Sequence, residues 1–427
     1  MFAAWEGAGG KRFLFHEKPE SLSLAVGETT VLTYDRAGRP YAAFLEGRNY
    51  RRGLDNRVLE KWSEVQAGRK VRRRRWLSPA EAEHFLDRLR GLVQEVQADL
   101  GRGPVRALQG PEDWRERVQA GLATLLRYDG ARLEEERQRY RQIYGSVSIL
   151  PPDQYRAVVV QATEGCHWNR CIFCDLYRDR PFRIRSREEF RAHVQEVKSF
   201  LGAGLTLRKS IFLGDANALI VAQASLRAFF SILEEEFGLL PPHLSGPERA
   251  AWRAAHPEGM EGVYAFIDAF SPQRKAVEDF AELRQRGLRR VYVGLETGHA
   301  PLLRWLNKPG CPEDLGALIV RLKEAGLQVG VILLVGAGGE AFAAGHVADS
   351  VALVNRLPLD EGDLVYLSEL VEPPHGEYSR QMAADHLTPL SPEQMRLQRE
   401  ALRSGLQGPS DRRGPKVTTY DLREFVY

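Results

Sequence analysis

The chain has 427 residues, of which 43% are hydrophobic and 27% charged, and its formal net charge is +3. This composition is typical of a folded globular protein and excludes a disordered chain. No apolar run approaches the roughly 18 residues of a membrane span, and the first residues lack the apolar core of a signal peptide. We therefore expect a cytoplasmic protein that is larger than one typical domain.

The first 150 residues are predicted to form two segments. Residues 1–77 are a basic, β-containing segment with a hairpin that turns at 35–38. Residues 78–150 are helical: Ser78 and Pro79 begin a long helix, and further helical patterns follow around 114–126 and 133–144. Within the first segment, residues 45–76 hold 11 lysines and arginines against 4 acidic residues.

Residues 151–375 alternate short β-branched runs with amphipathic helical patterns, which indicates parallel β/α units. The predicted strands are YRAVVVQA, SIFLG, GVYAFIDAF, RVYVGLE, VGVILLVG and LVYLSEL. Six such units favour an α/β fold with a partial (β/α)6 TIM-like barrel, although topology alone leaves a doubly wound sheet open. Residues 239–261 are expected to be an insertion between the second and third units, and residues 376–427 a polar C-terminal extension of helix and tail.

Three of the four cysteines, Cys166, Cys171 and Cys174, lie in the stretch ATEGCHWNRCIFCDLY, directly after the first predicted strand. Barrel sites form where such strands end. Closely spaced thiolates can bind zinc or an iron–sulfur cluster, and structural zinc requires four ligands. Cys311 lies in a different unit, and His167 adjoins Cys166, which makes it an awkward ligand for the same ion. The open coordination position favours a chemical role over a structural one.

This stretch resembles the cluster loop of the radical S-adenosylmethionine (radical SAM) superfamily, in particular its Elp3/MiaB/NifB-like core domain. The spacing here is CxxxxCxxC, whereas CxxxCxxC is the commonest in the family. The resemblance implies that Cys166, Cys171 and Cys174 bind three irons of one 4Fe–4S cluster. The fourth iron would chelate S-adenosylmethionine (SAM), and an electron donor such as flavodoxin or ferredoxin would reduce the cluster. Four cysteines are too few for a second cluster.

The resemblance also implies SAM contacts at the ends of later strands. Phe173 would pack beside the adenine. The segments FLGDAN, VGLETG, ILLVGAGGE and YLSELVEPP resemble the family's cofactor-contacting segments, and they place Gly214, Asp215, Glu296, Thr297, Gly336 and Leu370 at the cofactor. Without the resemblance, the glycines are equally explained as turn residues and Glu296 as a surface carboxylate. No catalytic residue is identified.

Several polar residues beside this loop allow two interpretations. Asp268 and Ser271 could face the substrate, but Ser271 is equally a helix N-cap. One of the arginines that follow the cysteines could bind the methionine carboxylate of SAM, although a solvated basic loop is the simpler interpretation for each. These arginines are Arg178, Arg180, Arg183 and Arg185.

The basic N-terminal segment interleaves arginines, including 72–75, with Tyr50, Trp62 and Trp76. Positive charge with aromatic side chains can bind nucleic acid. We favour instead a solvated or packed charged face, so a nucleic-acid partner is possible but not favoured.

The leading hypothesis is a radical SAM enzyme that uses one 4Fe–4S cluster to cleave SAM reductively and abstracts hydrogen from a substrate that the sequence does not identify. The alternative is a non-catalytic metal- or nucleic-acid-binding protein with a structural three-cysteine site.

Overall fold

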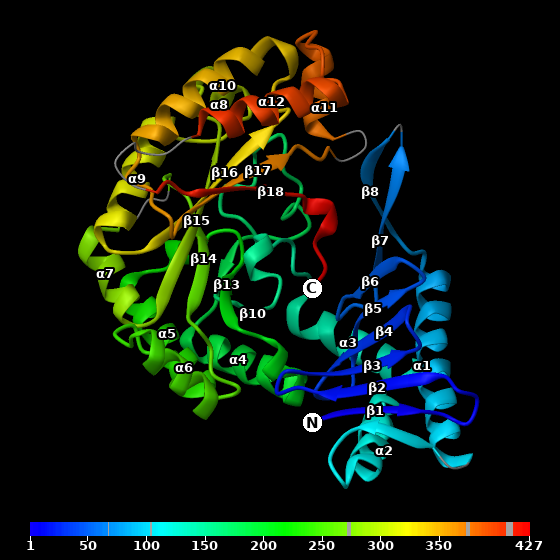
Figure 1. Ribbon diagram of the computed structural model, residues 1–427. Coiled ribbons are helices and arrows are strands. Elements are labelled where there is room, and N and C mark those ends of the chain that lie inside the picture. The colour runs from blue at the N-terminus through cyan, green and yellow to red at the C-terminus, as the bar shows by residue number, and fades with distance from the viewer. Residues whose placement is uncertain (67, 103–104, 271–274, 373–375, 407–412) are drawn as a thin grey trace.

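The protein is described by a computed structural model with two large sheets and their helices (Figure 1). A third, two-stranded sheet pairs β11 (Thr163–Glu164) with β12 (Arg183–Ile184). An antiparallel sheet is built from the N-terminal residues, and a parallel sheet follows it along the chain. Among the described residues, we find no helix with both the length and the apolar composition of a membrane span. The described residues are 1–66, 68–102, 105–270, 275–372, 376–406 and 413–427.

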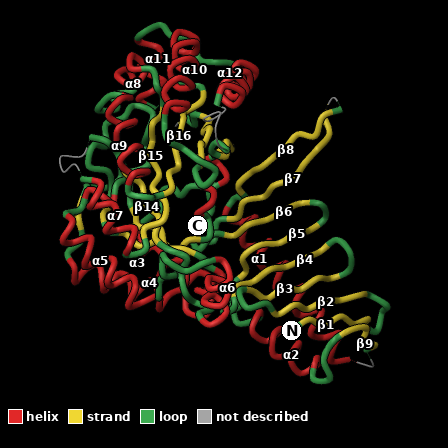
Figure 2. Tube along the Cα trace, turned by 60° about the vertical axis from the view of Figure 1, so that its left-hand side comes forward, coloured by secondary structure: helices red, strands yellow, loops and turns green. Residues whose placement is uncertain are grey.

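The N-terminal sheet is an antiparallel meander in which consecutive strands lie side by side, in the order β8-β7-β6-β5-β4-β3-β2-β1-β9. Figure 2 shows these strands as a ladder, with the β7–β8 hairpin extending beyond the others. Their bounds are β1 Phe2–Glu6, β2 Arg12–Glu17, β3 Ser21–Val26, β4 Thr30–Asp35, β5 Pro40–Leu45, β6 Arg48–Arg52, β7 Val58–Gln66, β8 Arg69–Trp76 and β9 Arg106–Gln109. The predicted hairpin at 35–38 is confirmed as the β4–β5 connection.

Alternating apolar residues give this sheet one buried face. In β3, for example, Leu22, Leu24 and Val26 are buried, and the intervening residues are not fully buried. The helices of residues 78–150 cover this face and complete a hydrophobic core of its own. They are α1 Pro79–Arg102, α2 Trp114–Leu125 and α3 Gly130–Tyr144, close to the predicted positions.

The second sheet is entirely parallel, and its strands follow one another in chain order without reversal. All six predicted runs form strands of this sheet. They are β10 Ala157–Gln161, β13 Ser210–Gly214, β14 Val263–Ile267, β15 Leu288–Glu296, β16 Gln328–Val335 and β17 Leu364–Glu369. A doubly wound sheet reverses its order in the middle, so the unbroken order excludes that alternative and gives barrel-like winding.

Helices between the strands cover the outer face of this sheet (Figure 1). Their apolar sides form the larger hydrophobic core together with the strands, in which β10 and β13 are buried at every residue. The helices are α4 Arg187–Leu201, α5 Gln223–Phe237, α7 Val277–Gln285, α8 Ala300–Trp305, α9 Pro312–Glu324 and α10 Gly339–Arg356. The predicted helix start at 271–272 lies outside the described residues.

The C-terminal residues are more than an extension, which corrects the sequence-based prediction. Besides α11 (Glu377–Ala384) and α12 (Pro392–Gly405), they supply β18 (Lys416–Tyr420), a seventh parallel strand paired with β17. The run KVTTY is too short and too polar to stand out in the sequence. It becomes a strand because β17 offers an edge and because Tyr420 packs against Tyr366, with ring centroids 5.5 Å apart.

Arg39 joins the two parts of the molecule. This buried side chain donates from Nε to Glu136 of α3 at 2.8 and 2.9 Å, and to the backbone oxygens of Phe200 and Leu201 at 2.6 and 2.8 Å. Those two oxygens end α4 and have no partner within the helix. The guanidinium thus fixes the N-terminal sheet to the first β/α unit of the parallel sheet.

Candidate functional site

The three cysteines lie on a loop beyond β10, at the carboxyl end of the parallel sheet. Cys166, Cys171 and Cys174 are half-buried, and none forms a disulfide. Gly165 precedes them with φ of 73°, and a Cβ atom there would approach the oxygen of Pro181 to 2.8 Å. A side chain at this position would therefore disturb both the backbone and the loop packing.

The longer first gap of the cysteine motif is held in place by specific hydrogen bonds. Trp168 Nε1 donates to the Asn307 oxygen at 2.9 Å, and Asn307 Nδ2 donates to the Arg170 oxygen at 2.8 Å. Asn169, which has a left-handed backbone, donates from Nδ2 to the Tyr177 oxygen at 2.8 Å. The insertion of one residue relative to the commonest spacing is thus accommodated by a turn clamped to the segment after α8.

The surroundings disfavour negative charge on the thiols. Burial raises the pKa of Cys171 to about 12 and that of Cys174 to about 11. The Glu296 carboxylate adds to both shifts, whereas the Lys308 ammonium opposes the shift of Cys171. Thiolates are stable in such a place when a positively charged metal centre binds them.

A buried ion pair lies beside the thiols. Glu296 ends β15 in a left-handed conformation, and its Oε1 accepts from Lys308 Nζ at 2.7 Å. Their side chains are only 11% and 9% exposed. Lys308 also donates to the Gly294 oxygen at 2.5 Å, and Glu296 and Cys171 raise its pKa against the opposing effect of burial. Lys308 was not identified from the sequence, where LNKPG resembles an ordinary helix-ending turn.

Asp215 braces the base of the cysteine loop. Its Oδ2 accepts from the Gly165 N–H at 3.1 Å and from Arg180 Nε at 3.3 Å, and its Oδ1 accepts from Gln161 Nε2 at 3.4 Å. Burial raises the pKa of this carboxyl group, and the Arg180 guanidinium opposes the shift. Ser146 and Ser148 hold Arg180 from the other side, each at 2.6 Å. Arg180 is therefore the loop arginine whose position is most firmly determined.

The other predicted cofactor contacts lie at the expected strand ends, and several are engaged within the protein. The Thr297 hydroxyl is fully buried between the His299 N–H, at 3.0 Å, and His346 Nδ1, at 2.8 Å. The Gly336 N–H donates to Gln398 of α12 at 2.7 Å, so α12 covers the end of β16. Phe173 and Leu370 pack together with a small apolar cluster, and Gly214 ends β13.

Asp268 lies at the end of β14, close to the cysteine loop. His167 Nε2 is 3.6 Å from its carboxylate, and Asn217 Nδ2 donates to the same group. The His167 ring stacks on Phe270 with centroids 5.1 Å apart. These contacts join the end of β14 to the cysteine loop at His167. Ser271, the other predicted substrate-facing residue, lies outside the described residues.

The arginine-rich part of the basic N-terminal segment lies on β6 and in the β7–β8 hairpin, and several of its arginines have acidic partners. Arg73 contacts Glu64, Arg74 contacts Asp421, and Arg75 contacts Glu60, at 2.5 to 2.6 Å. The aromatic residues are also engaged: Arg48 lies over Trp62, Arg57 lies over Trp76, and Tyr50 stacks on Phe85. This pairing favours the packed charged face over a nucleic-acid surface.

The central part of the chain is similar to a known protein family. Residues 160–344, which include all three loop cysteines, match the model of the radical SAM superfamily. The match to the radical SAM superfamily thus covers the parallel sheet from β10 to the start of α10 and less than half of the chain. Enzymes of this family use a 4Fe–4S cluster and SAM. No curated protein matches the chain.

Solved structures of radical SAM enzymes resemble the chain at low identity. Coproporphyrinogen III oxidase HemN from Escherichia coli is 14% identical, with a TM-score of 0.40 over 62% of this chain and 54% of its own. Elp3 from Methanocaldococcus infernus is 12% identical, with a TM-score of 0.38 over 61% and 55%. HydG, a maturase of the [FeFe]-hydrogenase, is 15% identical, with a TM-score of 0.37 over 76% and 65%. The match spans less than two thirds of each of these proteins.

The donor set fits a cluster better than a single ion. Among the described residues, no three histidine, cysteine or acidic side chains converge on one metal position. A 4Fe–4S cluster takes one thiolate at each of several irons, so its ligands are spaced more widely than those of one ion. Three half-buried thiols on one loop, with no fourth ligand that completes a metal site in the described part of the chain, meet this requirement.

Proposed function

We propose that this protein is a single-cluster radical SAM enzyme acting on an organic substrate. Cys166, Cys171 and Cys174 would hold the 4Fe–4S cluster. The observation that carries the proposal is the loop of three cysteines at the carboxyl end of β10, inside the radical SAM domain and next to the buried Lys308–Glu296 pair. When bound, the reduced cluster supplies the electron that cleaves SAM to methionine and a 5′-deoxyadenosyl radical, the general chemistry of the family.

Lys308 and Glu296 are suited to the amino-acid portion of SAM, which carries one carboxylate and one ammonium group. The Lys308 ammonium offers donors to a carboxylate, and the Glu296 carboxylate accepts from an ammonium. Because both side chains are nearly excluded from water, such contacts are stronger here than at an exposed site. Glu296 thus keeps its predicted cofactor role and gains Lys308 as its partner.

Asp215 and Arg180 act on the loop instead of on the cofactor. Through the Gly165 N–H, the Asp215 carboxylate fixes the backbone immediately before Cys166. We assign to this pair the task of keeping the thiols in position when the cluster binds. The electron donor would be a small redox protein such as flavodoxin or ferredoxin, and the substrate is unspecified.

The test is anaerobic reconstitution followed by iron, sulfide and product analysis. We expect about four irons and four sulfides per chain and, with a strong reductant, conversion of SAM to 5′-deoxyadenosine. Cys171→Ala should abolish both the cluster and the product.

Cys311→Ala is the matched control, because Cys311 lies outside the cysteine loop, directly before α9. Its Sγ donates a hydrogen bond to Asp314 Oδ2 at 3.3 Å. The variant should retain both readouts. Stoichiometric zinc in anaerobically purified protein, with no cluster after reconstitution, would contradict the proposal and favour a structural three-cysteine site.

A further inference from the structure

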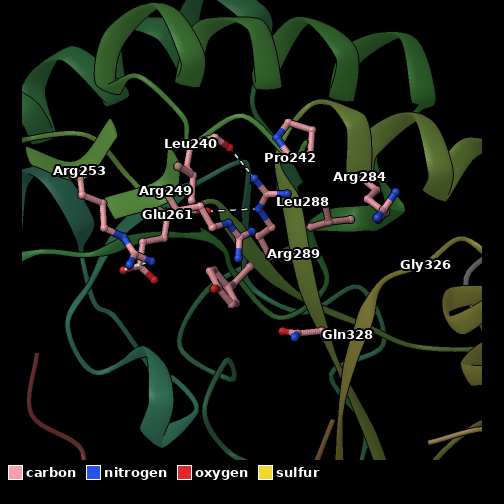
Figure 3. Close-up of a pocket in the computed structure, with 11 residues that line it drawn as sticks. Leu240, Pro242, Arg249, Arg253, Glu261, Arg284, Leu288, Arg289, Gly326 and Gln328 are labelled. Carbon is pink, nitrogen blue, oxygen red and sulfur yellow. Dashed lines mark hydrogen bonds and ion pairs between the residues drawn. The ribbon is translucent and has the colours of Figure 1, made fainter. Parts of the chain in front are cut away.

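A cleft of about 230 Å³ lies at the amino end of the parallel sheet, among the first residues of β14, β15 and β16 (Figure 3). The insertion at 239–261 forms one wall, because it contributes α6 (Gly246–Ala255) and the chain on either side of that helix. The cysteines lie beyond the opposite end of the strands. Since β15 has nine residues at about 3.3 Å each, the two ends are roughly 30 Å apart.

The lining of this cleft carries excess positive charge. It includes Arg249, Arg253, Arg284 and Arg289 but, among the described residues that line it, a single acidic side chain, Glu261. Arg253 pairs with Glu261 at 3.0 Å. Within the described part of the chain, no carboxylate lies within ion-pair distance of the other three arginines. Among the described residues, the guanidinium groups of Arg249, Arg284 and Arg289 therefore line the cleft without a carboxylate partner of their own.

Arg289 positions the wall of the cleft. Its guanidinium donates to the backbone oxygen of Glu261 at 3.2 Å and to that of Leu240, so it ties both ends of the insertion to β15 (Figure 3). These oxygens satisfy its hydrogen bonds but do not cancel its charge. Burial and the nearby positive charge of Arg249 lower the pKa of Arg289, which is consistent with cations gathered around a partly dry space.

Arg249 and Arg284 enter the cleft from two different helices. Arg249 belongs to α6, and its Nε atom is buried without a hydrogen-bond partner among the described residues. Arg284 belongs to the last turn of α7 and lies against Gly326, where an added Cβ atom would be 3.1 Å from the Arg284 Nε. An unpaired buried donor costs about 1–3 kcal/mol, and a bound anion would remove that cost.

We propose that this cleft binds a phosphate group, either as inorganic phosphate or as the phosphate of a small ester. The planar fork of a guanidinium matches two oxygens of one phosphate, and Arg249 and Arg284 would each supply such a fork. The volume is several times the roughly 30 Å³ of a water molecule but below the 300–1,000 Å³ of pockets for drug-sized ligands. It therefore suits a phosphate with at most a small organic group.

This site goes beyond the proposed function. Its ligand would lie at the opposite end of the strands from the thiols, so it would not be the molecule on which the radical acts. The proposal does not depend on the cluster, and its test does not use the radical reaction.

The experiment is isothermal titration calorimetry of the reconstituted protein with inorganic phosphate and, separately, with glycerol 3-phosphate. Sodium chloride at matched ionic strength and glycerol are the blanks. We expect saturable binding of at least one phosphate probe to wild-type protein. Arg249→Gln and Arg284→Gln should each weaken it by roughly tenfold or more, because each removes charged hydrogen bonds. The double variant Arg253→Gln with Glu261→Gln removes a matched pair without changing the net charge of the lining, so it should change the affinity by less than about twofold.

Circular dichroism and iron content of each variant establish that it is folded. Tighter binding of glycerol 3-phosphate would assign the site to a phosphate ester, and binding of inorganic phosphate alone would assign it to the free ion. Either result supports the proposal. No saturable binding by wild-type protein, an equal loss in the double variant of Arg253 and Glu261, or binding of polynucleotide without binding of either small probe would overturn it.

Discussion

The two ends of the parallel sheet differ in how their charged side chains are paired. At the carboxyl end, beside the thiols, the buried charges are matched within the protein: Lys308 with Glu296, and Arg180 with Asp215. At the amino end, Arg249, Arg284 and Arg289 line a cleft in which, counting only described residues, the one acidic side chain is Glu261, and it is paired with Arg253. Matched charges stabilise the protein's own architecture, whereas unmatched cations indicate that a negative group comes from outside.

The largest expected effect is a difference in stability between two variants, each of which removes one charge from one end of the sheet. Lys308→Met leaves the buried Glu296 carboxylate without its partner, which should lower the free energy of unfolding by about 3–5 kcal/mol. Arg284→Met removes an uncompensated cation and should change that free energy by less than about 0.5 kcal/mol, or raise it. Denaturant unfolding of both variants measures the difference.

The double variant Lys308→Met with Glu296→Gln separates stability from cofactor binding. It should recover much of the lost stability, because no unpaired charge remains, but it should not recover SAM affinity. Equal destabilisation by Lys308→Met and Arg284→Met would contradict the distinction between the two ends.

A smaller loss of stability is expected when Asp215, which holds the start of the cysteine loop, is changed. Asp215→Asn removes the charge that holds Arg180 and weakens the acceptor for the Gly165 N–H, at a cost of about 1–3 kcal/mol. Because Asp215 holds the backbone directly before Cys166, we also expect less iron per chain after reconstitution. The molecules that do carry the cluster should bind SAM with unchanged affinity. Full iron content in Asp215→Asn would assign the carboxylate a role other than positioning the loop.

Acid should weaken the carboxyl end through a buried histidine. His193 Nε2 accepts from the Gln161 N–H at 3.0 Å, where β10 ends, and burial lowers the pKa of His193 from 6.5 to about 3. Above pH 6.5 neither the folded nor the unfolded chain protonates this residue. Between pH 6.5 and 3 only the unfolded chain does, so stability should fall by about 1.4 kcal/mol per pH unit.

His193→Gln, measured by unfolding at each pH, should remove this part of the slope. Arg284→Gln at the amino end is the control and should leave the slope unchanged, because arginine does not titrate in this range. An unaltered slope in His193→Gln would show that other groups cause the acid sensitivity.

The smallest effect is expected at the β7–β8 hairpin, which tests whether paired arginines behave differently from those of the cleft. Alanine at Arg72, Arg73, Arg74 and Arg75 should leave cluster content and SAM cleavage intact. Wild-type protein should show no binding to single-stranded RNA at physiological salt in a fluorescence anisotropy titration. Tight binding with a log–log salt slope near −0.7 per contact, flattened by nearly three units in the variant, would instead make nucleic acid a partner.

Local patterns in the sequence were sufficient for the elements and for the cluster loop. The six β-branched runs became strands, the turn at 35–38 joined β4 to β5, and Ser78 and Pro79 began α1. Each of these depends on residues a few positions apart, whose side-chain periodicity and backbone preferences act locally. The cysteine spacing is local for the same reason, and it was sufficient to predict the resemblance to the radical SAM superfamily.

Tertiary structure alone decided which of these pieces meet. Strand order cannot be read from the strands themselves, and only the observed order excluded the doubly wound sheet and admitted β18 beside β17. Trp168 and Asn307 are 139 positions apart, yet their contact clamps the cysteine loop. Glu296 was identified as a candidate, but its partner Lys308 has no local signal. The phosphate cleft is the extreme case: its arginines come from an insertion, from the end of a helix and from the start of a strand. Only packing brings their charges close enough to repel one another.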